Sequence, residues 1–322
     1  MEVERLTEAA KAGDPHAQNE LGLRYHLGNG VSLDLTEAAA WYRKSAEQGL
    51  SIPQYNLGLM YREGFGVKQN YETAFDWTTK AAHQGLANAQ YDVGLMHEFG
   101  HGTPQDDAQA VQWLTRAAEQ GKPEAQNHLG MRYAEGRGVL KDDALALLWT
   151  KKAAEQGLIE AQHHLALMYL DGIGAQQEDE RAAFWANKAA QQGHEGAIYN
   201  VGQMYLKGRG MLQDTSKAMA SFRILAEKGN VLCQYNLGVL YFQLDTLKDN
   251  AQARFWYEKA AAQGYADAQA NLALMYINGN GVPKNYSVAA DYLSKAAAQG
   301  HVGAQHNLKM ILKKIQGQGK LH

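Results

Sequence analysis

Residues 97–101, His-Glu-Phe-Gly-His, have the His-Glu-x-x-His spacing of zinc proteases. In that chemistry both histidines lie one turn apart on the same helical face and bind zinc, and the glutamate acts as the base. In this chain Gly100 and Gly102 predict a loop that ends the helix, so we expect His101 to lie outside it. No third ligand follows at a matching distance. The motif therefore predicts neither a metal site nor a catalytic residue.

Other residues whose side chains could bind a metal or take part in catalysis are also assigned structural roles. His128, His163 and His164 lie in adjacent repeats and are expected at the surface or in a groove, since a shared metal would need special geometry between neighbouring helices. Loops such as residues 136–138, Gly-Arg-Gly, lack the preceding strand and the Gly-Lys-Ser/Thr of a phosphate loop. The single cysteine, Cys233, excludes an intramolecular disulfide and a cysteine-rich zinc site. We expect no cofactor and no enzyme; a hydrolase is the less favoured alternative.

Composition limits the partners. The 322 residues include 31 Lys and Arg against 34 Asp and Glu, for a net charge of −3. With a pI near 6.5, the chain has no overall basic field for nucleic acid or an anionic membrane, and we expect neither as a partner. The first eight residues contain three acids and no apolar run, so a cytoplasmic location is predicted. If a signal was removed, the location would be periplasmic or secreted.

Glycine and tryptophan recur with a fixed period, which predicts a repeat protein. Glycines stand 36 residues apart, with one interval of 35, at Gly13, Gly49, Gly85, Gly121, Gly157, Gly193, Gly229, Gly264 and Gly300. All six tryptophans occupy one column of this grid: Trp41, Trp77, Trp113, Trp149, Trp185 and Trp256. Ser221 and Tyr292 take that column in the two repeats that lack tryptophan.

Each repeat predicts two helices. In residues 53–63, Leu57, Met60 and Tyr61 follow the spacing of one helical face, and Gly64 ends the helix. The second helix opens with an expected N-cap, in turn Asp34, Asn70, Asp106, Asp142, Asp214, Asp249 and Asn285. A glycine inside the first helix, such as Gly58, costs about 1 kcal/mol in helix propensity. Close approach of a neighbouring helix would explain it.

The pattern predicts an all-α chain of about 18 helices, built as a single solenoid domain over residues 1–316. Residues 1–14 form an N-terminal capping helix over 3–12, residues 15–300 form eight repeats, and residues 301–316 form a C-terminal capping helix. Residues 317–322 are expected to be a flexible tail. The seventh repeat is one residue short and carries residues 242–247 where Gly-x-Gly should stand, so we expect a different loop there.

The repeat resembles the Sel-1-like repeat, the 36-residue relative of the tetratricopeptide repeat. Residues 125–157 carry the pattern almost intact, with Ala125, Leu129, Gly130, Tyr133, Gly136, Gly138, Val139, Asp142, Ala146, Trp149, Ala153, Ala154 and Gly157. The resemblance implies a right-handed α/α superhelical solenoid and a scaffold or adaptor that binds proteins, often in bacteria. The alternative is an immunity or inhibitor protein that neutralises a bacterial toxin. A β-lactam-hydrolysing branch is not favoured, because its paired cysteines are missing.

Counted from its leading Ala as position 1, the first helix places positions 1, 5, 8 and 9 in the core and positions 3, 7, 10 and 11 on the opposite face. By resemblance to tetratricopeptide arrays, that second face lines a concave groove. It is apolar and aromatic, with Tyr55, Leu59, Tyr91, Leu95, Phe99, Met131, Leu167, Leu170, Tyr199, Leu206, Tyr235, Val239 and Phe242. Position 4 adds a polar column, with Asn56, Asp92, His128, His164, Asn200, Asn236, Asn271 and Asn307.

These columns predict a groove that binds a protein or peptide, since tyrosine gives broad contact and asparagine both donates and accepts hydrogen bonds. The predicted partner-binding residues are Tyr55, Asn56, Tyr91, Phe99, His163, Tyr199, Asn200, Tyr235, Asn236 and Phe242. In the alternative interpretation, position 7 packs against the next repeat and tyrosine covers the seam. Acids near the ends of the first helices, Glu63, Glu98, Glu135 and Asp171, favour a basic partner or simply a solvated face. We expect a monomer.

Overall fold

The structure is a computed structural model that describes residues 2–243 and 249–318, in which 18 α-helices and no strands are found. The chain forms two compact units, residues 1–177 (unit 1) and 178–322 (unit 2). Unit 1 contains α1 (Glu2–Lys11), α2 (Pro15–Leu27), α3 (Leu35–Glu47), α4 (Ser51–Glu63), α5 (Tyr71–His83), α6 (Ala87–Phe99), α7 (Asp107–Glu119), α8 (Pro123–Glu135), α9 (Asp143–Glu155) and α10 (Ile159–Asp171). Unit 2 contains α11 (Asp179–Gln191), α12 (Glu195–Lys207), α13 (Thr215–Glu227), α14 (Val231–Gln243), α15 (Asn250–Ala262), α16 (Ala266–Asn278), α17 (Tyr286–Ala298) and α18 (Val302–Gln318).

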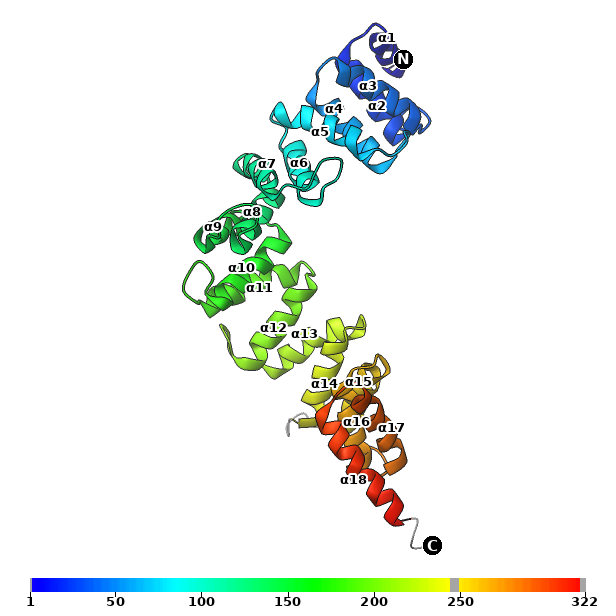
Figure 1. Ribbon diagram of the computed structural model, residues 1–322, viewed down its shortest axis with the longest axis vertical. Helices are drawn as coiled ribbons and strands as arrows, with labels where there is room; N and C mark the ends of the chain where they lie inside the picture. The colour runs from blue at the N-terminus through cyan, green and yellow to red at the C-terminus, as the bar shows by residue number, and fades with distance from the viewer. Residues whose placement is uncertain (1, 244–248, 319–322) are drawn as a thin grey trace. The chain divides into compact units, whose positions relative to one another are not determined.

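Within each unit, every helix packs against its neighbours in the chain (Figure 1). From α2 onward, the even-numbered helices are the first helices of the repeats and the odd-numbered helices are the second. The all-α repeat solenoid predicted from the period is confirmed, and α18 runs to Gln318, two residues past the end predicted for the last helix. A single domain over residues 1–316 stays a prediction. No helix among the described residues combines the length and apolarity that crossing a bilayer requires.

The ends of the helices follow the caps that the sequence predicts. The first helix α8 ends at Gly136, whose φ of 69° is left-handed, and the second helix α9 begins after Asp142, whose carboxylate accepts the amide of Leu145. The same side-chain cap forms at each predicted residue, Asp34, Asn70, Asp106, Asp142, Asp214, Asp249 and Asn285. At α11 the N-cap is Glu178, whose side chain makes no capping bond.

Glycine inside the first helices allows the two helices of a repeat to meet closely, as predicted. A Cβ added at Gly58 would lie 2.4 Å from Oγ1 of Thr78 and 3.2 Å from the carbonyl oxygen of Ala74. At Gly238, the added Cβ would lie 2.5 Å from the ring of Tyr257. Any side chain at these positions would push the second helix away. The cost in helix propensity is therefore offset by packing.

In most repeats, a ladder of glutamines joins the two helices of the repeat to each other and to the preceding repeat. Nε2 of Gln54 donates to the carbonyl oxygen of Ala46 at 3.1 Å, and Oε1 of Gln54 accepts from Nε2 of Gln84 at 2.8 Å. The pairing recurs as Gln18–Gln48, Gln90–Gln120 and Gln126–Gln156 in unit 1, and as Gln234–Gln263 and Gln269–Gln299 in unit 2. Since buried polar groups need partners, the ladder fixes how one repeat docks on the next. No pattern in the sequence predicted this ladder.

Candidate functional site

Polar side chains on the first helices of unit 1 form a second ladder between repeats. Oη of Tyr55 donates to Oδ2 of Asp92 at 2.9 Å, and Oη of Tyr91 lies 3.0 Å from Nδ1 of His128. Nδ1 of His164 lies 3.1 Å from Oδ1 of Asn127. Each bond joins position 3 of one first helix to position 4 of the next, 37 residues later. The predicted groove residues Tyr55 and Tyr91 thus also hold the seam between repeats.

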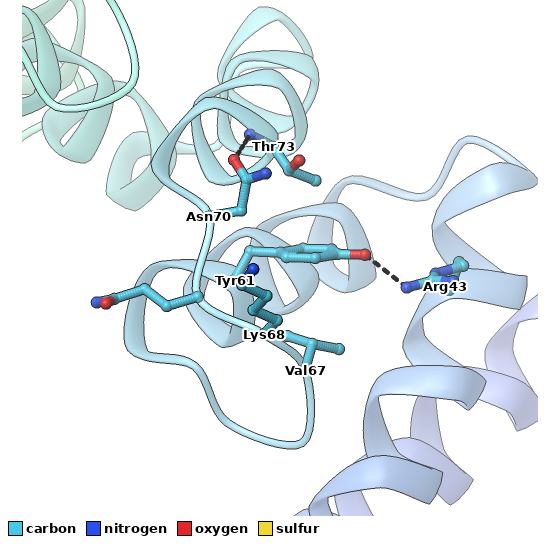
Figure 2. Close-up of a pocket in the computed structure, with 7 residues that line it drawn as sticks. Arg43, Tyr61, Val67, Lys68, Asn70 and Thr73 are labelled. Atoms are coloured by element: carbon cyan, nitrogen blue, oxygen red, sulfur yellow. Dashed lines mark hydrogen bonds between the residues drawn. The ribbon is translucent and has the colours of Figure 1, made fainter.

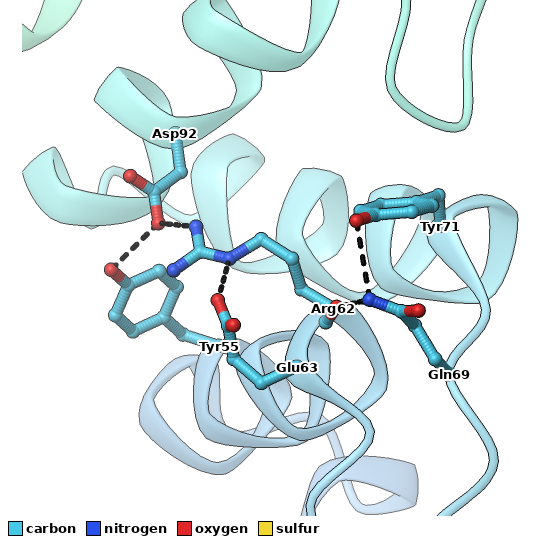
Figure 3. Close-up of polar contacts among 6 residues, drawn as sticks. All are labelled: Tyr55, Arg62, Glu63, Gln69, Tyr71 and Asp92. Carbon is cyan, nitrogen blue, oxygen red and sulfur yellow. Dashed lines mark hydrogen bonds and ion pairs between the residues drawn. The ribbon is translucent and has the colours of Figure 1, made fainter.

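Arg62 extends this ladder, as Figure 3 shows. Its Nη1 pairs with Oδ2 of Asp92 at 3.1 Å, and its Nε pairs with Oε1 of Glu63 at 2.8 Å. Asp92 therefore receives both Tyr55 and Arg62. Burial raises the pKa of the Tyr55 phenol, and the Asp92 carboxylate raises it further. At neutral pH the phenol stays protonated and serves as a hydrogen-bond donor, which excludes it as a base.

The remaining predicted residues of unit 1 differ in their surroundings. Asn56 is half-buried on α4, and His163 is half-buried beside His164, with ring centroids 6.1 Å apart. Phe99 is the last residue of α6, and 59% of its surface is exposed. Its ring lies 5.8 Å from that of His101. The structure therefore separates Phe99 from the hydrogen-bonded tyrosines and places it at a helix end.

In unit 2, the predicted aromatic residues pack against the second helices. Tyr199 contacts the ring of Phe222 and accepts a bond from Nε2 of Gln203, and Tyr235 lies between Tyr257 and Tyr265. Predicted residues that are half-buried on α12 and α14 complete this side of the unit, namely Asn200, Asn236 and Phe242. The part of the predicted unusual loop that spans residues 244–247 lies outside the described residues.

An apolar pocket opens between two first helices of unit 1. Its volume is about 220 Å³. We call it the α8–α10 pocket; it is lined by Gly130, Met131, Ala134, Glu135, Thr150, His164, Leu167, Met168 and Ile173. Positions 7 of both helices, Met131 and Leu167, were predicted to line the groove, and they meet in this pocket.

Acidic side chains end the two first helices that form the α8–α10 pocket, and Glu135 is part of its lining. Glu135 and Asp171, the last residues of α8 and α10, are exposed, and neither forms a salt bridge within the described part of the chain. Met131 is 37% exposed, so an apolar side chain is open to solvent beside them. Glu63 and Glu98 of the predicted acidic series behave differently. Glu63 pairs with Arg62. Glu98 is buried against Arg132, so the prediction that Glu98 lies on an exposed acidic face is wrong.

The three residues that have the zinc-protease spacing lie in three different environments. His97 lies on α6 with its ring edge-on to Phe75, and burial lowers its pKa. Glu98 pairs with Arg132, and His101 lies beyond the end of α6, stacked on Tyr71. Among the described residues, no group of three His, Cys, Asp or Glu side chains is arranged to hold a metal ion. His101 thus lies outside the helix, as predicted.

A larger cavity of about 600 Å³ lies where the loop after α4 meets α5 (Figure 2). Arg43 donates to Oη of Tyr61 on one side, and Oδ1 of Asn70 accepts the amide of Thr73 on the other. Val67, Lys68 and Gln69 complete the lining. No sequence motif pointed to this cavity. Because Asn70 caps α5 and Arg43 is engaged by Tyr61, these polar groups serve the fold, and we assign no ligand to the cavity.

His128 provides a test of the ladder by pH. Burial lowers its pKa, and Arg132 lowers it further, while Glu98 and Glu135 act in the opposite direction. The unfolded chain therefore binds a proton at this residue more readily than the folded chain, and stability falls as the pH drops below the ordinary value of 6.5. We expect His128→Asn to reduce the loss of stability between pH 7 and pH 5, measured by urea unfolding. His16→Asn, at an exposed position, is the control. Equal losses in wild type and His128→Asn would contradict the prediction.

Comparison with known proteins identifies the repeats. The Sel1 repeat model matches residues 15–50, 54–86, 87–122, 123–158, 159–194, 196–230, 231–265 and 266–301. A solved protective antigen of uropathogenic Escherichia coli with an SLR fold is 40% identical, with a TM-score of 0.90, over 97% of this chain and 67% of that one. A Sel1 repeat protein from Oxalobacter formigenes is 35% identical, with a TM-score of 0.71, over 97% of this chain and 90% of that one.

A shorter match links the chain to a protein of named binding activity. The secretory immunoglobulin A-binding protein EsiB of Escherichia coli is 44% identical over 43 residues, which are 13% of this chain and 9% of that protein. The chain thus spans about a tenth of this curated relative. The eight family matches, by contrast, cover most of residues 15–301. This chain belongs to the Sel1 repeat family.

Proposed function

We propose that this chain is a non-enzymatic protein-binding scaffold and that the α8–α10 pocket receives a large apolar side chain of the partner. The observation that carries the proposal is an open apolar pocket of about 220 Å³ with the exposed acid Glu135 in its lining. Ligand sites commonly combine an apolar lining with a few placed polar groups. Glu135, His164 and Thr150 supply those groups.

The family supports protein binding as the class of function. Sel1 repeats form protein-interaction scaffolds, and one relative is named for binding an immunoglobulin. The described residues assemble no metal cluster, and the only motif with catalytic spacing is dispersed over three environments. A cytoplasmic location and a monomeric state stay predictions.

The charge at the pocket specifies the partner further. Glu135 and Asp171 stand 36 residues apart at the ends of successive first helices. We propose that the partner segment places Lys or Arg next to its apolar anchor, because opposite charges across an interface favour association. Met131 and Leu167 would contact the anchor itself.

The test is a selection of displayed peptides on the full chain, followed by measurement of affinity. We expect enrichment of sequences with a large apolar residue beside Lys or Arg. Met131→Lys should weaken the selected peptides at least tenfold, because it places an ammonium group on the apolar wall and partly offsets the negative charge that attracts Lys or Arg. The matched control is Leu148→Lys, since Leu148 is 45% exposed on α9 and does not line the pocket.

Two results would overturn the proposal. One is that no peptide is enriched, and the other is that Met131→Lys and Leu148→Lys bind selected peptides equally well. Circular dichroism of both variants should show the helix content of the wild type, so that a loss of affinity reports on the pocket rather than on folding.

A further inference from the structure

The tryptophan column fills a repeated site between second helices. In unit 1, Trp113 on α7 packs against Ala82, Ala89 and Val93 of the preceding helices, and only 6% of its surface is exposed. Arg116, one turn later, lies over the indole at 4.4 Å. At other tryptophans of the column, a lysine three residues later lies over the indole in the same way, as at Trp41, Trp77 and Trp149. Each indole thus seals the junction with the preceding repeat.

The exposed fraction of the alanine that packs beneath each ring shows whether the ring's site is filled. In three repeats this alanine is only 1% exposed and belongs to the same hydrophobic core cluster as the ring. The pairs are Ala82 with Trp113, Ala118 with Trp149 and Ala226 with Trp256. Ala261, which shares a cluster with Tyr292, is 7% exposed. Ala190 is the equivalent residue before Ser221, and it is only half-buried. Replacement of tryptophan by serine has therefore left this position uncovered.

A cavity of about 310 Å³ occupies the place of the missing ring, within unit 2. We call it the Ser221 seat; its walls include Ala190, Ile198, Val201, Tyr205 and Ser221. Three repeats of 36 residues earlier, Ala82, Val93 and Trp113 hold the positions of Ala190, Val201 and Ser221. The seat is thus built from residues at the same repeat positions as those that hold an indole in unit 1. An apolar cavity of about 150 Å³ can hold benzene, so this one has room for a bicyclic ring.

The residues around the seat suit an aromatic guest. Ile198 stands where the other repeats carry the ladder glutamine, which makes the wall more apolar. The hydroxyl of Ser221 donates to the carbonyl oxygen of Lys217 at 3.1 Å and does not fill the space. Nζ of Lys217 lies over the ring of Tyr205 at 5.3 Å, at the edge of the seat. A positive charge there complements the negative face of an aromatic ring, as Lys and Arg do over the tryptophans.

We propose that the Ser221 seat binds the side chain of a tryptophan presented by a partner protein. The guest completes the row of indoles that the chain supplies itself in six other repeats. The seat lies between the second helices α11 and α13, whereas the α8–α10 pocket lies between first helices of unit 1. The two sites are therefore separate, and either can fail without the other.

The experiment titrates N-acetyl-tryptophanamide into the full chain by isothermal titration calorimetry. We expect saturable binding to the wild type, at least fivefold weaker binding of N-acetyl-leucinamide, and at least tenfold weaker binding of the tryptophan probe to Ser221→Trp. Ser216→Trp is the matched control, because Ser216 is exposed on the same helix outside the seat and should leave binding unchanged. Ser221→Trp should also raise the melting temperature by filling the seat.

A second variant tests the seat independently, in case Ser221→Trp fails to fold. Ala190→Leu narrows the seat from its floor and should weaken the probe at least fivefold. The proposal is overturned if the wild type shows no saturable binding, if the folded Ser221→Trp and Ala190→Leu variants bind as the wild type does, or if Ser221→Trp folds with a lower melting temperature. Binding of free indole without binding of N-acetyl-tryptophanamide would also overturn it, because a partner's tryptophan carries a backbone.

Discussion

Replacement of Arg132 by methionine is expected to destabilise unit 1 by about 3–5 kcal/mol, although methionine is the residue that related repeats carry. Arg132 stands at position 8, which is Met60, Met96 and Met168 in neighbouring repeats. Its side chain is 3% exposed and pairs with Glu98, which is 9% exposed, and with Asp107 at 3.1 Å. Removing the guanidinium leaves the buried Glu98 carboxylate without its partner.

The double variant Arg132→Met/Glu98→Leu separates the charge from the packing. Leucine occurs at the position of Glu98 in other first helices, as Leu170 and Leu206. With both charges gone, stability should return to within about 1 kcal/mol of the wild type, because a buried ion pair is often replaced by apolar residues without loss. Hydrogen exchange of the α8 amides measures the effect locally. A single variant as stable as the wild type, or a double variant as unstable as the single one, would contradict this account.

The fold was predictable because its determinants recur along the sequence. A glycine every 36 residues and an Asp or Asn before each second helix mark the helix ends, and the structure places caps such as Asp142 where they were expected. Gly58 and its equivalents predicted a close helix approach, which Thr78 confirms. Local signals of this kind need no knowledge of how repeats stack.

Contacts between repeats were harder to predict. The bond from Tyr55 to Asp92 spans 37 residues and requires the rotation of one first helix relative to the next. Gln54 is buried and donates to the carbonyl oxygen of Ala46 in the preceding repeat, a contact that no local pattern predicts. Glu98 was assigned to an acidic face because its partner, Arg132, lies in the following repeat. Ser221 was recognised in the tryptophan column, but only the folded structure shows the space that it leaves.

Alanine at Gly138 is expected to destabilise unit 1 by about 2–5 kcal/mol. Gly138 is the second glycine of its loop and has a φ of +72°, a conformation that costs an L-residue about 1–2 kcal/mol. An added Cβ would also lie 2.1 Å from the carbonyl oxygen of Asp107, the first residue of α7 in the preceding repeat. Gly102 and Gly174 meet the preceding second helix in the same way, so this contact is part of the stacking. The overlap forces a backbone shift and adds about 1–3 kcal/mol.

Gly157→Ala isolates the two contributions. Gly157 has a φ of +93°, but an added Cβ would have no atom within 4 Å, so only the conformational cost of about 1–2 kcal/mol applies. Urea unfolding of both variants, with hydrogen exchange in α7 and α8 as the local readout, should show the larger loss for Gly138→Ala. Asp107 also pairs with Arg132 and Arg137, so its displacement should disturb the buried ion pair as well. If the two variants lose equal stability, the second glycine serves only the turn, and the proposed role of the loop in docking one repeat on the next is wrong.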